Sequence, residues 1–318
     1  MQRRSYGARV SDLAVFQQQR PRLFALAYRL LGSAADAEDV VQSAYLRWAG
    51  ARDVREPAAF LTTVVSRLCL DELRSARVRR ERYVGPWLPE PVASGELGPL
   101  ETAEQRSQVS YAALLLLERL TPQERAVCVL RDAFDYPYRD VAEVVGLTDA
   151  HCRQLHRRAR ARLAEGRARF EVPAERHAEL TLRLFAAAAA GEVAALEQLL
   201  AEDVVVLSDG GGAVSAARRP VSGRSRVARF LVGIAARTGP VEVRTGEVNG
   251  APALLVLDGG RLVGVAVAEP GPAGIRALYV TVAPDKLRRL SDQLEDPPAV
   301  TSGPAAPSEQ GQRQTSLP

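Results

Sequence analysis

Residues 138–163 place the strongest constraint on this chain, because they predict two helices joined by a sharp turn. Val141, Val144 and Val145 form an apolar stripe at helical spacing in the first helix, and Gly146 supplies the turn. Thr148 is placed to cap the second helix. The residues that we expect on its buried face are Cys152, Leu155, Ala159 and Leu163. This pattern predicts a helix-turn-helix that reads DNA.

The outer face of the second helix is rich in arginine. Arg153, Arg157 and Arg160 lie at positions i, i+4 and i+7, so they share one face. Residues 149–169 contain seven arginines and two acidic residues, a net charge of +5 that repels itself unless an anion lies against it. A guanidinium suits both phosphate oxygens and guanine edges. The alternative, a solvated basic helix, leaves this charge unexplained.

The length of 318 residues predicts two or three domains. Cys69, Cys128 and Cys152 are far apart and each stands in an apolar stretch without a nearby second ligand, so we expect neither a metal site nor a disulfide. The N-terminus lacks the apolar core of a signal peptide, and no run is long enough to span a bilayer. We therefore expect a cytoplasmic protein that does not enter membranes.

Residues 10–82 predict a domain of three helices. Pro21 opens the first helix and Gly32 ends it, Ser33 caps the second, and Pro57 begins the third. The third helix runs into residues 74–82, which hold five arginines and one acidic residue. The second helix has an acidic outer face that DNA would repel, so its partner should be a basic protein surface.

The order of motifs in this block resembles region 2 of the extracytoplasmic-function sigma factors of bacterial RNA polymerase. The resemblance rests on residues 36–42 (Asp-Ala-Glu-Asp-Val-Val-Gln), on Trp48, on Phe60-Leu61 and on residues 71–75 (Asp-Glu-Leu-Arg-Ser). It implies that core polymerase is bound by Asp36, Glu38, Asp39 and Gln42. It implies that the −10 promoter element is bound by Arg52, Asp53, Arg55, Arg74 and Arg77. Ser43 departs from the family, where an acidic residue often follows the glutamine.

Residues 83–108 are rich in proline, glycine and glutamate and predict a linker, and residues 109–170 predict a second helical domain that resembles sigma region 4. Within that domain, residues 121–124 (Thr-Pro-Gln-Glu) predict a capping box. The linker contains Trp-Leu-Pro-Glu-Pro at 87–91, a motif of a sigma-factor subgroup with an extra C-terminal domain. The resemblance implies that the −35 element is read by His151, Arg153, Gln154, Arg157 and Arg158, with Arg160 and Arg162 on phosphates.

Residues 173–290 predict an α+β domain, in which strands over 204–207, 213–220, 241–248, 253–257, 262–268 and 275–282 follow two helices, with one more helix over 224–237. The order resembles the SnoaL-like cone with its curved antiparallel sheet. Residues 209–212 (Asp-Gly-Gly-Gly) and 284–287 (Pro-Asp-Lys-Leu) resemble signatures of the same subgroup, although Ala213 and Ala283 replace its usual residues. We expect the tail at 291–318 to be disordered.

The fold class predicted is thus multidomain, with two all-α domains and a C-terminal α+β cone. We expect a sigma factor that binds core RNA polymerase and promoter DNA, needs no cofactor and is not an enzyme. No acid–base pair stands out, because His177 is isolated and expected on the surface, and the aspartates stand at turns. Whether the cone binds a small molecule is left open.

We expect the cone to regulate the other two domains by docking on the linker. The residues predicted to make regulatory contacts are Trp87, Leu88, Pro89, Asp209, Gly210, Gly211, Asp285 and Lys286. Two alternatives stay open at this point. One is a dimeric helix-turn-helix regulator with a ligand-sensing domain, and the other is an isomerase or cyclase fused to a DNA-binding module.

Overall fold

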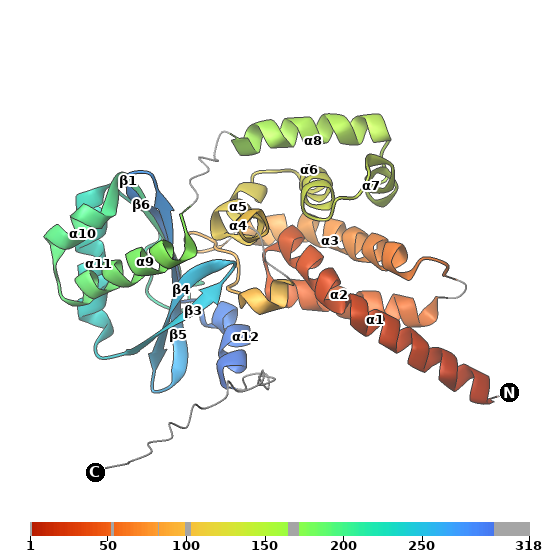
Figure 1. The fold of residues 1–318 in the computed structure, drawn as a ribbon, viewed down its shortest axis with the longest axis horizontal. Coiled ribbons are helices and arrows are strands. Elements are labelled where there is room, and N and C mark those ends of the chain that lie inside the picture. Colours follow the sequence, from red (N-terminus) through yellow and green to blue (C-terminus); the bar gives the residue numbers. More distant parts are fainter. Residues whose placement is uncertain (1, 52–53, 82, 99–102, 165–171, 296–318) are drawn as a thin grey trace, which may run out of the picture.

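The structure is a computed structural model that describes residues 2–51, 54–81, 83–98, 103–164 and 172–295. A helical part and a part built on a twisted sheet lie side by side, joined by several segments that cross between them (Figure 1). None of the helices described is both long and apolar enough to cross a membrane.

Three helices form the first block: α1 (Gln2–Leu31), α2 (Ala34–Gly50) and α3 (Pro57–Glu81). Two predictions are confirmed here, because Gly32 ends α1 in a left-handed conformation (φ 68°) and the Ser33 hydroxyl caps α2 by accepting from the Asp36 N–H. The prediction that Pro21 opens a helix is wrong, since α1 begins near the N-terminus and continues through it. Proline already has a helical φ and removes one hydrogen bond, and the buried leucines that follow keep the helix intact.

The second block begins with the 3-10 turn η1 (Ser94–Leu97) and contains five helices and a π-helical turn. These are α4 (Ala103–Val109), α5 (Tyr111–Leu117), α6 (Pro122–Cys128), the π turn η2 (Val129–Ala133), α7 (Tyr138–Val145) and α8 (Asp149–Ala164). The predicted capping box is confirmed, with Thr121 and Glu124 bonded to each other's backbone N–H. Gly146 ends α7 at φ 70°, as a helix-turn-helix requires.

The two helical blocks share one continuous apolar core. Polar contacts reinforce it: Arg67 of α3 donates to the carbonyl oxygens of Glu143 (3.0 Å) and Val144 (3.4 Å) at the end of α7. The Tyr136 hydroxyl also donates to Thr62 Oγ1 at 2.9 Å. The helix-turn-helix is therefore held against α3 and is not a separate body.

The C-terminal part begins with α9 (Ala174–Ala189) and α10 (Val193–Leu199) and ends with α12 (Pro284–Glu295). Its strands and remaining helix are β1 (Leu200–Asp209), β2 (Val221–Ser222), α11 (Arg224–Thr238), β3 (Glu242–Val248), β4 (Ala251–Asp258), β5 (Arg261–Gly271) and β6 (Gly274–Thr281). The strand order is β2-β1-β6-β5-β4-β3. An α+β architecture is confirmed, but the sheet is mixed and not purely antiparallel, because β1 runs parallel to β6.

Both faces of this sheet are buried. The side chains alternate, so Leu278 of β6 points into a core with α9, α10 and α11, whereas the next residue, Tyr279, points into a second core on the opposite face. That second core contains Leu88 of the linker, Tyr111 of α5 and Leu287 of α12. The sheet therefore packs its own helices on one side and the rest of the chain on the other.

Two further expectations for this part are wrong. The strand predicted over 213–220 is a run of turns and bends between the three glycines at 210–212 and Pro220, and only the two residues of β2 pair with β1. His177 is not on the surface: it is half-buried, its Nε2 lies 2.7 Å from the Ala268 carbonyl oxygen, and burial lowers the pKa of its imidazole. The helix predicted over 224–237 is confirmed as α11.

Gly32 and Gly146 offer a matched test of this packing. Both have φ near 70°, but a Cβ on Gly32 would lie 2.8 Å from Cη2 of Trp87, whereas one on Gly146 would have nothing within 4 Å. We expect Gly146→Ala to lower the free energy of unfolding by about 1 kcal/mol, the cost of the left-handed backbone alone. Gly32→Ala should cost roughly 1–3 kcal/mol more because of the overlap. Urea denaturation followed by fluorescence measures both, and equal losses would contradict the contact.

Candidate nucleic-acid interface and the contacts between domains

Helix α8 carries the candidate DNA-reading residues on its outer face. The Thr148 hydroxyl caps it, accepting from the His151 N–H at 3.2 Å. The predicted inner face is confirmed, since Cys152, Leu155, Ala159 and Leu163 are all buried. The residues exposed on the outer face include all seven predicted for −35 recognition: His151, Arg153, Gln154, Arg157, Arg158, Arg160 and Arg162. Figure 1 shows α8 at the edge of the helical part, away from the sheet.

Two of these arginines already hold protein partners. Arg153 pairs with Asp149 (Nε–Oδ1 2.8 Å) and lies over the Tyr138 ring, 4.6 Å from its centroid. Arg162 pairs at 2.8 Å with Glu124, the buried acid of the capping box. Within the described part of the chain, Arg157, Arg158 and Arg160 have no ion-pair partner. The guanidinium groups free to meet an anion are therefore concentrated in the middle of α8.

The candidate residues for the −10 element are only partly described. Arg52 and Asp53 lie outside the described residues, and so does the side chain of Arg77 on α3. Arg55 is exposed, and Arg74 is exposed and paired with Asp71 at 3.0 Å. These two side chains are accessible to a ligand.

The four residues of α2 predicted to contact polymerase differ in exposure and in ion pairing. Asp39 and Gln42 are exposed, and Asp36 is partly buried in the first turn of the helix. Glu38 instead forms ion pairs with Arg20 of α1 at 2.5 Å and with Arg289 of α12 at 3.5 Å. One of the four predicted polymerase contacts is therefore engaged by the C-terminal helix.

Glu90 of the linker holds the beginning of α2. Its carboxylate accepts from the Ser33 hydroxyl (2.8 Å) and from the backbone N–H groups of Ala34 (2.9 Å) and Ala35 (3.1 Å). Burial raises the pKa of the Glu90 carboxyl, while these donors act in the opposite direction. The Glu90 carboxylate of the linker thus pairs with N–H groups in the first turn of α2, which have no partner within the helix.

A buried ion pair joins the linker to the sheet. Asp209, at the end of β1, is fully buried and accepts from Lys286 Nζ (2.7 Å), Tyr83 Oη (2.6 Å) and the Leu88 N–H (2.8 Å). Lys286, the only lysine of the chain, also donates to the Leu88 carbonyl oxygen. Burial lowers the pKa of its ammonium group, and the attraction of Asp209 opposes this shift.

Aromatic rings enclose the ammonium group of Lys286. Its Nζ lies 4.5 Å from the centroid of the Trp87 ring and 4.8 Å from that of Tyr83. The Trp87 ring also meets the guanidinium of Arg80 on α3, whose Cζ lies 3.9 Å from the ring centroid. Burial, followed by the nearby Asp209, raises the pKa of the Tyr83 hydroxyl, which therefore stays a donor.

The predicted regulatory residues do not all take part in this contact. Trp87, Leu88, Asp209 and Lys286 come together, and the Gly211 N–H donates to Asp209 at 3.0 Å. Gly210 lies closely against Val214, so a side chain there would have no room. Asp285 is exposed beside Gly211, 3.4 Å from where a Cβ on that glycine would lie. Pro89 is buried, and no polar contact of it is described.

Asn249 is a contact residue that the sequence reasoning missed. It is fully buried in the β3–β4 turn at φ 54°, and its Nδ2 donates to the Tyr28 hydroxyl (2.5 Å) and the Val109 carbonyl oxygen (3.1 Å). Its Oδ1 accepts from the Val92 N–H at 3.1 Å. An Asn-Gly pair predicts a hairpin turn, so the sequence shows the turn and gives no sign of its three partners.

Comparison with known proteins agrees with this geometry. Residues 15–79 match the family described as Sigma-70 region 2, and residues 111–163 match Sigma-70, region 4. The chain is 40% identical to the ECF RNA polymerase sigma factor SigJ of Mycobacterium tuberculosis (strain ATCC 25618 / H37Rv), in an alignment of 302 residues that covers 92% of this chain and 94% of the relative. The chain belongs to the ECF family of RNA polymerase sigma factors.

Two further likenesses cover nearly the whole chain. A probable ECF RNA polymerase sigma factor SigI of Mycobacterium tuberculosis (strain CDC 1551 / Oshkosh) is 32% identical over 88% of this chain and 96% of its own. The crystal structure of the Mycobacterium tuberculosis extracytoplasmic function sigma factor SigJ superposes with a TM-score of 0.70 at 36% identity, over 87% of this chain and 98% of that one. The likeness therefore includes the C-terminal domain.

The buried ion pair predicts a specific effect on the linker of this sigma factor. Lys286→Met leaves the Asp209 carboxylate buried without its cation, a change that costs about 3–5 kcal/mol in buried pairs. We expect the amides of residues 83–92 to exchange hydrogen at least tenfold faster, as measured by mass spectrometry. Arg288→Met, an exposed cation two residues along α12, is the control and should leave exchange unchanged. Equal protection in both variants would show that the pair does not hold the linker.

Proposed function

We propose that this chain is a dissociable initiation subunit that binds core RNA polymerase and directs it to promoters with −35 and −10 elements. The observation that carries the proposal is the exposed face of α8, where Arg157, Arg158 and Arg160 have no ion-pair partner in the described part of the chain. Three adjacent unpaired guanidinium groups favour a polyanion as ligand. The sigma-factor family of the chain fits a promoter as that polyanion.

The −35 element is assigned to α8 as duplex DNA. The second helix of a helix-turn-helix lies in the major groove, and its side chains contact base edges there. Arg157 and Arg158 supply the base or phosphate contacts at the centre of the helix, with His151 and Gln154 exposed near its beginning. Arg162, which the family resemblance places on phosphates, pairs with Glu124 in this structure, so we propose that it contributes less to DNA binding than the unpaired arginines do.

The −10 element and the polymerase are assigned to the first helical block. The exposed Arg55 and Arg74 fit a strand of DNA near the start and the middle of α3, and Arg52, Asp53 and Arg77 are kept on the family resemblance. Asp36, Asp39 and Gln42 give α2 an acidic outer face that suits a basic protein surface. Separate surfaces of opposite charge are what a bridge between polymerase and DNA needs.

We infer that the hollow beneath α9 in the C-terminal domain has no acid–base chemistry of its own. A hollow of about 200 Å³ lies between α9 and the strands β3 and β4, lined by Ala178, Thr181, Leu182, Thr245, Gly246, Pro252, Ala253 and Leu254. No carboxylate or imidazole is among these lining residues, and acid–base chemistry requires such groups. His177 is bonded to the Ala268 carbonyl oxygen instead.

Transcription with reconstituted core polymerase tests the proposal. We expect the wild-type chain to start transcripts at particular promoters and bare core enzyme not to do so. Arg157→Ala should lower the affinity of the holoenzyme for its −35 element roughly tenfold or more, the cost of one base-reading arginine. Arg162→Ala is the control, because that guanidinium faces Glu124, and should change affinity less than about twofold. Wild-type transcription without promoter preference would overturn the proposal.

We also propose that the C-terminal domain restrains the chain by covering part of the polymerase-binding face. Arg289 of α12 pairs with Glu96 (3.0 Å) and Glu38 (3.5 Å), and its guanidinium lies 4.5 Å from the centroid of the Phe24 ring. One side chain thus ties α12 to α1, α2 and η1. A polymerase surface that takes Glu38 must compete with Arg289 for it.

Arg289→Ala tests this restraint. We expect the variant to bind core polymerase several-fold more tightly, because Glu38 loses its contact with α12 and keeps only its partner on α1, Arg20. Fluorescence titration of labelled chain with core enzyme measures this affinity. Arg288→Ala removes an exposed cation from the same helix and should leave the affinity unchanged. Unchanged or weaker binding by Arg289→Ala would show that α12 does not compete with polymerase.

A further inference from the structure

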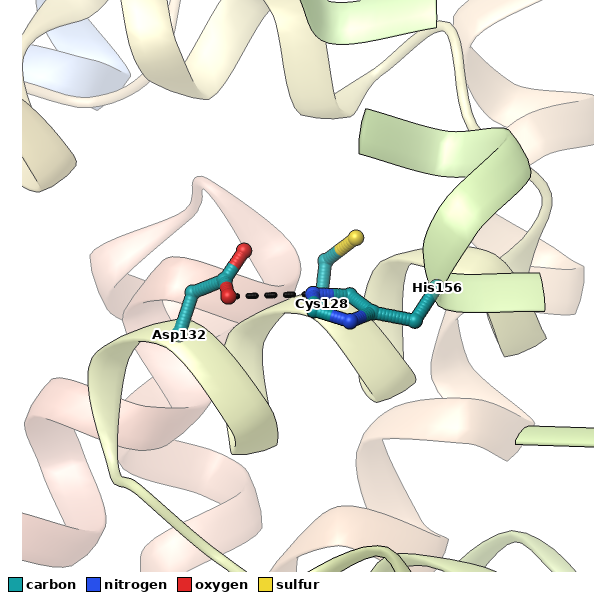
Figure 2. Close-up of side chains that lie close together, drawn as sticks. All are labelled: Cys128, Asp132 and His156. Carbon is teal, nitrogen blue, oxygen red and sulfur yellow. Dashed lines mark hydrogen bonds and ion pairs between the residues drawn. The ribbon is translucent and has the colours of Figure 1, made fainter. Parts of the chain in front are cut away.

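Three potential metal ligands meet between α6, the π turn η2 and α8. Cys128 is the last residue of α6, Asp132 lies four residues later in η2, and His156 projects from α8 toward both (Figure 2). One ligand atom from each lies within 4.8 Å of the other two. The expectation that no cysteine has a second ligand nearby is therefore wrong for Cys128, because the helix-turn-helix brings distant residues together.

The cluster is enclosed on most sides. Cys128 is 2% exposed and His156 is 7% exposed, whereas the Asp132 side chain is 34% exposed and leaves one open approach. His156 Nε2 lies 3.0 Å from Asp132 Oδ1, and His156 Nδ1 lies 2.7 Å from the Tyr138 hydroxyl. Both ring nitrogens are thus engaged, one toward the cluster and one toward a fixed tyrosine.

We propose that Cys128 Sγ, an Asp132 carboxylate oxygen and His156 Nε2 form a site for one divalent transition-metal ion of the zinc class. Thiolate, imidazole and carboxylate are the ligands that Zn²⁺ takes in proteins, and three of them leave a fourth position for water. The open side at Asp132 is where that water would enter. None of the three ligands is among the DNA and polymerase contacts assigned above.

The surroundings of His156 match those of a metal-binding histidine. Such histidines almost always bond their other ring nitrogen to a fixed partner, which sets the tautomer and the ring orientation. Tyr138 has this role here, and its ring is itself held against Arg153, 4.6 Å from the centroid. The π turn adds a second indication, because single π turns within α-helices occur frequently at functional sites.

Metal binding needs only small changes. With bonds of about 2.0–2.3 Å, ligand atoms of a tetrahedral site lie about 3.5 Å apart. Separations here are at most 4.8 Å, so the widest must close slightly and the 3.0 Å between His156 Nε2 and Asp132 Oδ1 must open slightly. The ion replaces the Asp132–His156 hydrogen bond, the imidazole proton moves from Nε2 to Nδ1, where it is donated to the Tyr138 hydroxyl, and the Cys128 thiol releases its proton to solvent. Affinity therefore rises with pH, because a proton competes with the metal for sulfur.

The position of the site determines what the metal would control. His156 lies between Arg153 and Arg157 in the sequence of α8, and its side chain points inward where theirs point outward. A metal held by all three ligands joins η2 to α8 and fixes the rotation of α8 about its axis. The ion would thus set the orientation of the arginine face from behind.

Cobalt titration of the full-length, untagged, reduced chain tests the proposal. Co²⁺ reports each ligand by absorption: a thiolate-to-cobalt charge-transfer band in the near ultraviolet and strong visible bands of a four-coordinate ion. We expect both to saturate at one Co²⁺ per chain, to disappear when Zn²⁺ is added, and to strengthen as pH is raised. Absence of a charge-transfer band in the wild-type chain would overturn the proposal.

Matched variants assign the ligands. Cys128→Ser should abolish the charge-transfer band, whereas Cys69→Ser and Cys152→Ser, at the other two buried cysteines, should keep it. Asp132→Asn, at the most exposed ligand, should fold normally and bind Co²⁺ more weakly. Tyr138→Phe keeps the ring and removes only the hydroxyl, and should weaken binding about tenfold. A band that persists in Cys128→Ser, or an affinity unchanged in both Asp132→Asn and Tyr138→Phe, would refute the site.

Discussion

The arrangement of domains depends on one buried ion pair, between Lys286 of α12 and Asp209 at the end of β1. A charged pair this deep requires full hydrogen bonding, and the linker provides it through the Tyr83 hydroxyl and the backbone of Leu88. The partners come from three parts of the sequence, so none can be satisfied unless linker, sheet and final helix are assembled together. The interaction thus contributes specificity of assembly more than stability.

The sheet extends this coupling, because each of its faces serves a different part of the protein. One face packs on α9, α10 and α11 and would suffice for an independent domain. The other face contacts Leu88 and Tyr111, which belong to the linker and to the second helical block. Asn249 adds a polar contact to α1 at the same boundary. Removing the C-terminal domain would therefore expose apolar surface on the sigma-factor part itself.

Local signals in the sequence predicted local structure well. Ser33, Thr121, Gly146 and Thr148 mark helix ends through backbone chemistry that acts within four residues, and all four take the predicted roles. Contacts between residues far apart in the sequence were harder to predict. The helix continues through Pro21 because the residues around it are packed. No local pattern shows that Asn249, Glu38 or Arg162 has a distant partner. The arginine face of α8 is visible in the sequence as a charge pattern at helical spacing, whereas the residues assigned to the −10 element and to polymerase rest on the family pattern.

The contact between α3 and α7 differs in kind from the contact at the sheet. Arg67 donates to two carbonyl groups at the C-terminal end of α7, where water can replace the guanidinium without leaving an unpaired group. The carboxylate of Asp209 has no such substitute. Water can therefore replace the polar contact between α3 and α7 but not the one at Asp209. If the two helical blocks move apart on a promoter, we expect the separation to begin at the end of α7.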